Sequence, residues 1–247
     1  MTKTYAFPKR EPQLPLEKLL SMNELEITKY VLEMRYLTLG QIITRFYDEG
    51  RVEESVRKLL NLQILKCKDE TLNEQSLFLA TLKGFELVQA EWKDKKIPQV
   101  TKSVMPGRLN HDLLLNDLRI RFEQLNYLKQ WASEQSLKEV PLFLREFQNM
   151  PDACCKKKND KSYFLELEVA MKNAKAYRDR IETYLKVLQH PDMKGAGIEG
   201  VIFFCTDDKV VEVIKKQIPK EAKGISVMPY YKYFANKDEE PRSVTVH

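Results

Sequence analysis

The sequence lacks the features that mark membrane and secreted proteins. No apolar run approaches the roughly 18 residues that a membrane-spanning helix needs. The start, MTKTYAFPKREPQLP, contains no apolar signal core. The four cysteines form no CxxC pair and two of them, Cys154 and Cys155, are adjacent, which suits neither a zinc site nor a disulfide framework. We therefore expect a cytoplasmic protein with reduced thiols and no membrane partner.

Internal repeats and long low-complexity tracts are also lacking, which excludes solenoids and disordered scaffolds. The 247 residues, 43% of them hydrophobic, are enough for two domains of ordinary size. Forty-one Lys and Arg against 36 Asp and Glu give a net charge of +5, which is consistent with a polyanionic partner. Residues 93–109, KDKKIPQVTKSVMPGRL, combine basic side chains with prolines and a glycine, so we place an extended basic linker there.

Residues 16–92 have the pattern of a winged helix-turn-helix. Asn23 is expected to cap a first helix, and Thr38 with Gln41 has the spacing of a capping box that opens a second, LGQIITRFY. A third helix, RVEESVRKLLNL, is amphipathic. Two short β-like runs, ILKCK and SLFLA, precede a last helix capped by Thr81. Three helices, a β-hairpin and a closing helix follow one another in the winged-helix order.

In winged-helix folds the third helix enters the major groove while the wing touches the DNA backbone. The expected contacts are Arg51, Arg57 and Lys58 on the third helix, and Thr44 and Arg45 at the end of the second. A charged helix face is also ordinary solvated surface, and winged helices also serve as protein–protein modules. Glu53 and Glu54 on the same helix count against tight DNA binding by that helix alone.

Residues 110–235 have the pattern of an α/β domain with a central mixed sheet. A helix of about five turns is expected from Asn110. Two strands around a polar turn follow, then the helix NAKAYRDRIETYLKVLQ, the strand VIFFC, the helix VVEVIKKQI and a last strand in GISVMPYYKYF. Residues 236–247 are expected to be a disordered tail. The fold class is therefore α/β in this half and α+β over the whole chain.

The second strand of the expected hairpin carries two glutamates on one face. Alternation in FLELEV places its aliphatic side chains on one face and Glu166 with Glu168 on the other. If the hairpin loop is the three residues 158–160, Asp152 lies across from Glu166. Such carboxylates repel one another unless a cation neutralises them. Mg²⁺ and Mn²⁺ prefer oxygen ligands and activate water for attack on phosphate, so this patch is a candidate metal site.

Basic side chains follow the glutamates. Lys172 is placed to neutralise charge developing on a phosphate or to orient the nucleophile. A positive electrostatic potential that attracts a nucleic-acid backbone is expected from Lys175, Arg178 and Arg180. A simpler interpretation also stands, in which the glutamates decorate an edge strand and Lys172 only pairs with Glu168.

The stretch PDA at 151–153 followed by ELEVAMK at 166–172 resembles the PD-(D/E)xK nuclease superfamily. Within it, the chain is similar to the plasmid replication-relaxation family, which includes MobC-type relaxases. That family couples an N-terminal winged helix to a restriction-endonuclease-like domain and has an HD-containing helix, which His111 and Asp112 match. The resemblance covers residues 24–230 approximately.

The resemblance implies roles for five residues. It makes Asp152, Glu166 and Glu168 metal-binding and catalytic carboxylates, Lys172 a displaced motif lysine, and His111 an auxiliary residue. The chain departs from the strict motif, because the position two after Glu166 is Glu168 and not a lysine. Hydrolysis would require Lys172 to take over the role of that lysine. At a helix start, His111 is also a cap or core neighbour in many proteins.

Three functions follow from these patterns. The first is a Mg²⁺- or Mn²⁺-dependent endonuclease that nicks or cleaves DNA during mobilisation or replication of a plasmid or mobile element. Its partner is double-stranded DNA, single-stranded at the nick. The second is a catalytically inactive, site-specific DNA-binding regulator of plasmid replication or transcription. The third is a structural protein that recruits other DNA-processing proteins. A homodimer is one of the alternatives for the assembly, because many winged helices read paired half-sites.

Overall fold

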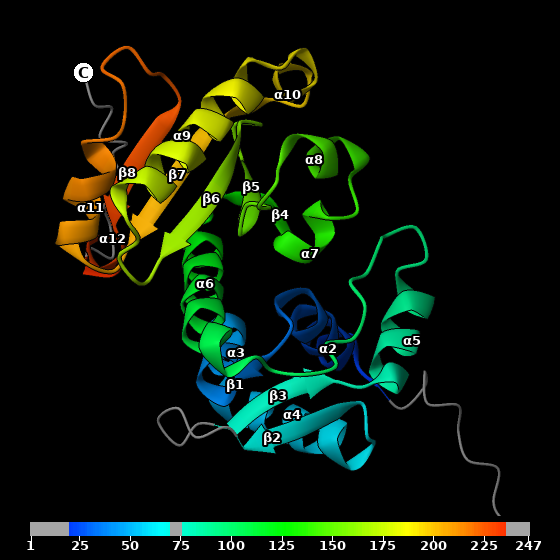
Figure 1. Cartoon of the computed structure of the whole chain (residues 1–247). Coiled ribbons are helices and arrows are strands. Elements are labelled where there is room, and N and C mark those ends of the chain that lie inside the picture. The colour runs from blue at the N-terminus through cyan, green and yellow to red at the C-terminus, as the bar shows by residue number, and fades with distance from the viewer. Residues whose placement is uncertain (1–19, 70–75, 236–247) are drawn as a thin grey trace, which may run out of the picture. The chain divides into compact units, whose positions relative to one another are not determined.

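The computed structural model describes residues 20–69 and 76–235 (Figure 1). The chain is a mixed α/β protein with a three-stranded sheet and a five-stranded sheet. It divides into two compact units, the first formed by residues 1–42 and 48–101 and the second by residues 43–47 and 102–247. The expected tail, 236–247, lies outside the described residues. Within the described ranges, none of the helices has both the length and the apolar composition to cross a membrane.

The small sheet belongs to the first unit and has the order β1-β3-β2, with both pairs antiparallel. The helices and strands of this part of the chain are, in order, α2 (Met22–Met34), β1 (Leu37–Thr38), α3 (Leu39–Phe46), α4 (Glu49–Asn61), β2 (Leu65–Asp69), β3 (Ser76–Ala80) and α5 (Leu82–Glu91). The expected order of three helices, two strands and a helix is confirmed. The short strand β1 was not predicted, because two residues carry no periodicity.

Capping side chains fix where these helices begin. Thr38 and Gln41 each accept the other's backbone amide at 3.2 Å, which confirms the predicted capping box at α3. Thr81 caps α5 as predicted. The prediction of Asn23 as the first cap was wrong, because Ser21 caps α2 two residues earlier through a reciprocal box with Glu24. The earlier start lets Glu24 accept both from Ser21 and from Lys58.

The first unit buries the apolar positions that recur at helical spacing. Tyr30 is 5% exposed, and Ile27 and Val31 are fully buried. Burial of this kind, on the order of 2 kcal/mol for each large aliphatic side chain, stabilises helices that are too short to persist alone. The buried hydrophobic residues of α2 and α4 are Leu25, Ile27, Tyr30, Val31, Leu32, Met34, Val52, Val56 and Leu59.

The five-stranded sheet of the second unit has the order β4-β5-β6-β7-β8. The first three strands are antiparallel neighbours and the last three are parallel, so the predicted mixed sheet is confirmed. Its elements are α6 (Pro106–Gln124), β4 (Leu128–Ser133), α7 (Glu134–Leu137), α8 (Pro141–Glu146), β5 (Ala153–Lys157), β6 (Ser162–Glu168), α9 (Ala174–Gln189), α10 (Pro191–Gly195), β7 (Ile198–Cys205), α11 (Asp208–Lys215), β8 (Ile225–Pro229) and α12 (Tyr230–Ala235).

Three local differences from the sequence-based expectation have simple causes. Helix α6 begins at Pro106 and not at Asn110, because proline is favoured in a first helical turn. The edge strand β4 and the short helices α7 and α8 were not predicted, because an edge strand with exposed residues and helices under two turns carry little periodicity. The expected last strand ends at Pro229, and α12 follows it.

Each face of the large sheet packs against its own helices. Phe164 of β6 belongs to a cluster with Tyr177, Ile181 and Tyr184 of α9. Its neighbours Leu165 and Leu167 belong to a second cluster with residues of α6. The alternation predicted for FLELEV is therefore confirmed. Glu166 and Glu168 share the Phe164 face, which α9 covers, so these glutamates lie inside the unit and not on an exposed edge.

We expect Gly200→Ala to destabilise the second unit. A Cβ at Gly200 of β7 would lie 2.1 Å from the carbonyl oxygen of Gly224, so the paired backbones must separate. The expected loss of unfolding free energy is about 1 to 3 kcal/mol, measured by urea denaturation followed by circular dichroism. Gly195→Ala is the matched control, since nothing lies within 4 Å of its Cβ position. Equal midpoints for the two variants would contradict the close approach.

Candidate active site

Three carboxylates lie on neighbouring strands, Asp152 directly before β5 and Glu166 with Glu168 on β6. Ala153 pairs with Leu165, and continuing this register by one residue sets Asp152 opposite Glu166. A hydrogen bond of 2.8 Å from the Lys157 amide to the carbonyl of residue 161 closes the hairpin around residues 158–160. The predicted three-residue loop is confirmed, and with it the predicted position of Asp152.

Asp152 is anchored by the backbone of the neighbouring strand. Its Oδ2 accepts the Leu167 amide at 2.8 Å and lies 3.1 Å from Nε2 of His111 on α6. The side chain is 14% exposed. A carboxylate held by one amide and one imidazole has a fixed orientation, and it presents its remaining oxygen surface to the site.

His111 connects α6 to this site. Its Nδ1 lies 3.3 Å from Oδ1 of Asp112, and its Nε2 faces Asp152. Burial lowers the pKa of His111, but the hydrogen bonds to the two aspartates outweigh it and raise the pKa to about 10. Both ring nitrogens therefore donate at neutral pH. Arg108 extends the network, since it contacts Asp112 at 3.7 Å and Glu134 at 2.8 Å.

Glu166 is enclosed by donors from α9. Its Oε1 accepts from Nη2 of Arg180 and from the hydroxyl of Tyr184. Burial raises the pKa of Glu166 and the charge of Asp152 raises it further, whereas Arg180 and Tyr184 oppose them, which leaves the pKa at about 7. This glutamate is only 6% exposed, so the simpler interpretation of a solvated edge pair is wrong for it.

Arg180 has a different place from the one expected. It was predicted to add positive field for a nucleic-acid backbone, but its side chain is only 15% exposed and points to Glu166. Its guanidinium also donates to the main-chain oxygens of Asn149 and Met150, in the loop that leads to Asp152. The spacing in the sequence could have predicted this inward position, because Arg180 precedes Tyr184 by one helical turn and borders the apolar face of α9.

Glu168 has one paired and one unpaired oxygen. Its Oε1 lies 2.9 Å from Nζ of Lys172, which extends from the loop after β6 and is 58% exposed. Its Oε2 is buried and has no hydrogen-bond partner among the described residues. Burial raises the pKa of Glu168, and Lys172 opposes that effect. An unpartnered buried carboxylate oxygen is rare in folded proteins and calls for a ligand, an ion or water.

A divalent cation fits the donor chemistry of this site. Asp152, Glu166 and Glu168 offer only carboxylate oxygens, which Mg²⁺ and Mn²⁺ prefer, and the unpartnered oxygen of Glu168 supplies a free donor. Their side chains do not converge on one point, since no set of three metal-ligating side chains is assembled in residues 20–69 and 76–235. Oε1 of Glu166 is engaged by Arg180.

Most of the residues expected to contact DNA lie on exposed helical surfaces, whereas Arg45 and Lys58 are half-buried and pair with glutamates. On α4, Arg57 is exposed, and Arg51 is exposed with a 3.3 Å pair to Asp48. Lys58 donates to buried Glu24 at 2.9 Å, which directs it towards α2. Thr44 lies on α3.

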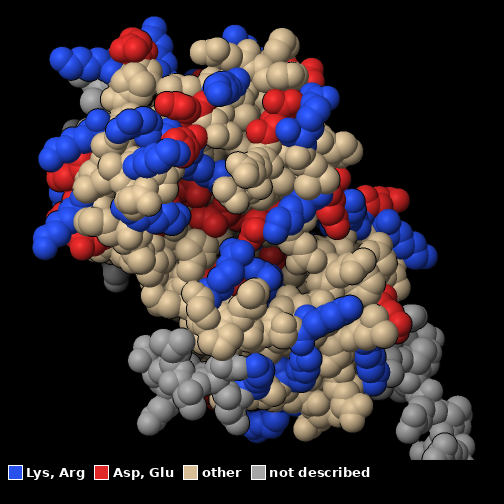
Figure 2. Space-filling view, viewed as in Figure 1, with Lys and Arg blue, Asp and Glu red and all other residues tan. Residues whose placement is uncertain are grey.

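In the second unit, Lys175 and Arg178 are exposed on α9, beside Asp179 and Gln217 respectively. Figure 2 shows Lys and Arg side chains gathered over the region of α9 and α11. Arg45, near the end of α3, belongs to the segment that groups with this unit and pairs with Glu123 of α6. The exposed face of α9 thus carries Lys175 and Arg178 together with Asp179, and Arg180 is turned inward from it.

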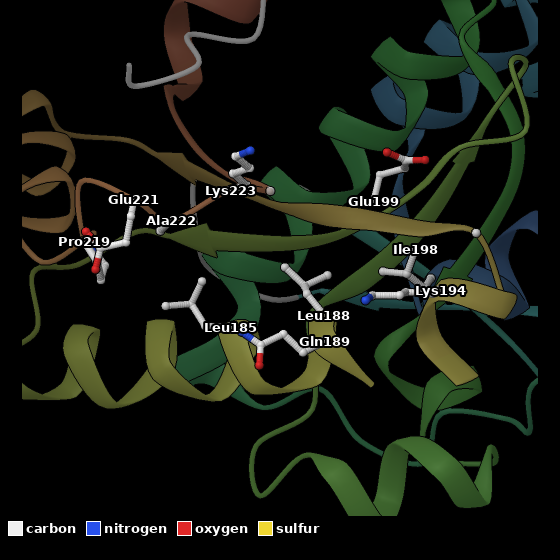
Figure 3. A pocket seen from close by; sticks show the side chains of 12 residues that line it. Leu185, Leu188, Gln189, Lys194, Ile198, Glu199, Pro219, Glu221, Ala222 and Lys223 are labelled. Carbon is white, nitrogen blue, oxygen red and sulfur yellow. The ribbon is translucent and has the colours of Figure 1, made fainter. Parts of the chain in front are cut away.

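A separate hollow lies between α9 and the starts of β7 and β8 (Figure 3). Its volume is about 710 Å³, and Leu185, Leu188 and Ile198 form its apolar wall. Lys194 and Lys223 are balanced there by Glu199 and Glu221. None of the three site carboxylates lines it, so this hollow is not part of the candidate active site.

The chain has no significant match to a protein-family model, to a characterised protein or to a solved structure. The resemblance to nuclease-like relaxases therefore rests on the residues of this chain alone.

We expect stability to depend on His111 in a specific direction. A group whose pKa is raised by folding stabilises the protein below its unfolded pKa and loses that contribution as pH approaches the folded value. In EDTA, the unfolding free energy should fall between pH 6.5 and pH 10, by roughly 1.4 kcal/mol per pH unit at most. His111→Gln should flatten this slope in urea titrations, whereas His190→Gln, on the loop before α10, should keep it. Parallel slopes for wild type and His111→Gln would contradict the network.

Proposed function

We propose that this chain is a DNA-binding endonuclease, with a winged helix as its first unit and a nuclease-like domain as its second. The observation that carries the proposal is the carboxylate site. Asp152 and Glu168 lie at one end of the large sheet, and Glu168 keeps a buried oxygen without a partner among the described residues. Folding isolates such an oxygen only at a cost, which a bound cation offsets.

The order of elements in the first unit supports the winged-helix assignment. Helices α2, α3 and α4 precede the β2–β3 hairpin, and β1 completes a small antiparallel sheet. In that fold α4 is the recognition helix. Its exposed face carries Arg51 and Arg57, which suit phosphate and base contacts in a major groove.

The topology of the second unit supports the nuclease-like assignment. An antiparallel meander, β4-β5-β6, is followed by α9 and a parallel strand β7, and α6 packs on the other face. The motif residues lie on neighbouring strands, with Asp152 directly before β5 and the ExE pair on β6. This arrangement supports the nuclease-like assignment.

The residues divide the chemistry among themselves. A bound Mg²⁺ or Mn²⁺ would supply Lewis acidity and an activated water, held by Asp152 and Glu168. His111 holds Asp152 in orientation from α6. Lys172 is the exposed cation beside Glu168, so it is placed to contact the phosphate under attack. Lys175 and Arg178 on α9 bind the flanking backbone.

The biological setting of the proposal comes from the resemblance. Nicking of one strand during mobilisation or replication of a plasmid or mobile element is the activity that the family pattern implies. The winged helix then selects the duplex site at which the second unit acts.

A second candidate, a catalytically inactive DNA-binding regulator, is favoured by one specific observation. Each carboxylate already has a cationic partner in the chain, His111 for Asp152, Arg180 for Glu166 and Lys172 for Glu168. Internal pairing of this kind stabilises a folded domain without any metal.

We expect the protein to convert supercoiled plasmid carrying its own gene region into open circles with Mg²⁺ or Mn²⁺, and EDTA to abolish the reaction. Glu168→Gln keeps the shape of the side chain but removes its charge, so the nicking rate should fall by about 100-fold or more. Rates are read from agarose gels over time.

Glu199→Gln is the matched control, since Glu199 is an exposed glutamate of β7 away from the site and should leave the nicking rate unchanged. Supercoils that persist with Mg²⁺ and Mn²⁺, despite demonstrated binding at the locus, would reject the endonuclease in favour of the regulator.

DNA binding by α4 is tested through salt dependence. Arg57→Gln removes an exposed cation, so the slope of log affinity against log salt should become shallower by about 1. Fluorescence anisotropy with a labelled duplex at several salt concentrations measures the slope. Lys29→Gln on α2 removes the same charge from a side chain paired with Glu33 and should leave the slope unchanged. Equal slopes for Arg57→Gln and wild type would exclude α4 as the phosphate-binding helix.

A further inference from the structure

Arg180 and Tyr184 make the most enclosed contact of the candidate site. They lie one turn apart on α9, and both donate to the same oxygen of Glu166. The guanidinium also lies 4.9 Å from the ring centroid of Tyr184 and 5.9 Å from that of Phe147. We call Arg180 and Tyr184 the Glu166 clamp.

The clamp is held from two further directions. Arg180 donates to the carbonyls of residues 149 and 150, which precede Asp152. Tyr184 is fully buried among aromatic rings, with Phe147, Phe164 and Phe203 centroids within 5.9 Å of its own. A guanidinium with this many partners is fixed in place, because any movement breaks several hydrogen bonds and a stacked contact at once.

The cation that pairs with Glu168 is held far less firmly than Arg180. Lys172 contacts Glu168 through one ion pair and is 58% exposed, so it can leave Glu168 at little cost. Arg180 is only 15% exposed and has no comparable path to solvent. The two glutamates therefore differ in their readiness to accept a new cation, although they are two residues apart on one strand.

We propose that the Glu166 clamp competes with a divalent cation for Glu166 and thereby limits how tightly the site binds metal. The inference rests on the proposed function, since it concerns the same carboxylates. In this arrangement Glu168 and Asp152 are the primary donors, and Glu166 offers Oε1 to a cation only on leaving Arg180 and Tyr184. The clamp therefore weakens metal loading at Glu166, and full use of this glutamate needs a rearrangement between β6 and α9.

The competition is tested by metal affinity and not by cleavage. Mn²⁺ is titrated into the EDTA-treated and dialysed full chain by isothermal calorimetry, and the melting temperature is followed with and without Mn²⁺. Arg180→Met removes the buried cation while keeping an apolar side chain, so Mn²⁺ affinity should rise about tenfold or more, because a neighbouring opposite charge shifts an ionic equilibrium by at least that factor. The melting temperature should also gain more from Mn²⁺ than in wild type.

Tyr184→Phe guards against a folding defect in Arg180→Met. It removes one donor to Glu166 and leaves the ring in place, so it should fold and raise Mn²⁺ affinity in the same direction by a smaller factor. Arg178→Gln is the matched control, since it removes a positive charge from the exposed face of the same helix and should leave Mn²⁺ affinity near the wild-type value.

The outcomes separate the two proposals. Mn²⁺ affinity that is unchanged or lower in folded Tyr184→Phe and Arg180→Met overturns the competition, even if wild type nicks DNA. The competition is also overturned if neither the wild type nor any variant binds Mn²⁺. Higher affinity in both variants supports the competition, and a lack of nicking by those Mn²⁺-loaded proteins would then reject the endonuclease alone.

Discussion

The burial of Glu166 beneath α9 is the constraint on which the second unit depends. A carboxylate enclosed in an apolar face is tolerated only with strong donors, and Arg180 and Tyr184 provide them. Through Arg180 the same contact fixes the loop before Asp152, and through Tyr184 it joins the aromatic cluster under the sheet. The ion pair between Arg180 and Glu166 therefore links the strand β6, the packing of α9 and the position of the candidate catalytic aspartate.

Around that pair, the three carboxylates differ in how many hydrogen-bond partners they have. Glu166 is clamped, Asp152 is anchored by an amide and by His111, and Glu168 retains an oxygen without a described partner beside exposed Lys172. The oxygen without a described partner is therefore the one on the glutamate whose other oxygen pairs with exposed Lys172.

Much of the fold was predictable because the signals were local. The capping box of Thr38 and Gln41, the Thr81 cap and the alternation in FLELEV depend on neighbours in sequence, and all three were confirmed. The hairpin loop followed from strand alternation and turn residues, which also set Asp152 opposite Glu166. Edge strand β4 and the short helices after it were not predicted, because they depend on tertiary contacts and show no periodic pattern in the sequence.

The sequence by itself determined which carboxylates share a face, since alternation on a strand and a hairpin register are properties of the backbone. It did not determine what faces them. The distances from Arg180 to Glu166 and from His111 to Asp152 depend on how α9 and α6 pack on opposite faces of the sheet, and the partners are 14 and 41 residues apart. Only the tertiary structure decided that Arg180 points inward while Arg178 stays exposed, because helix rotation against a sheet is set by the packing of the whole apolar face.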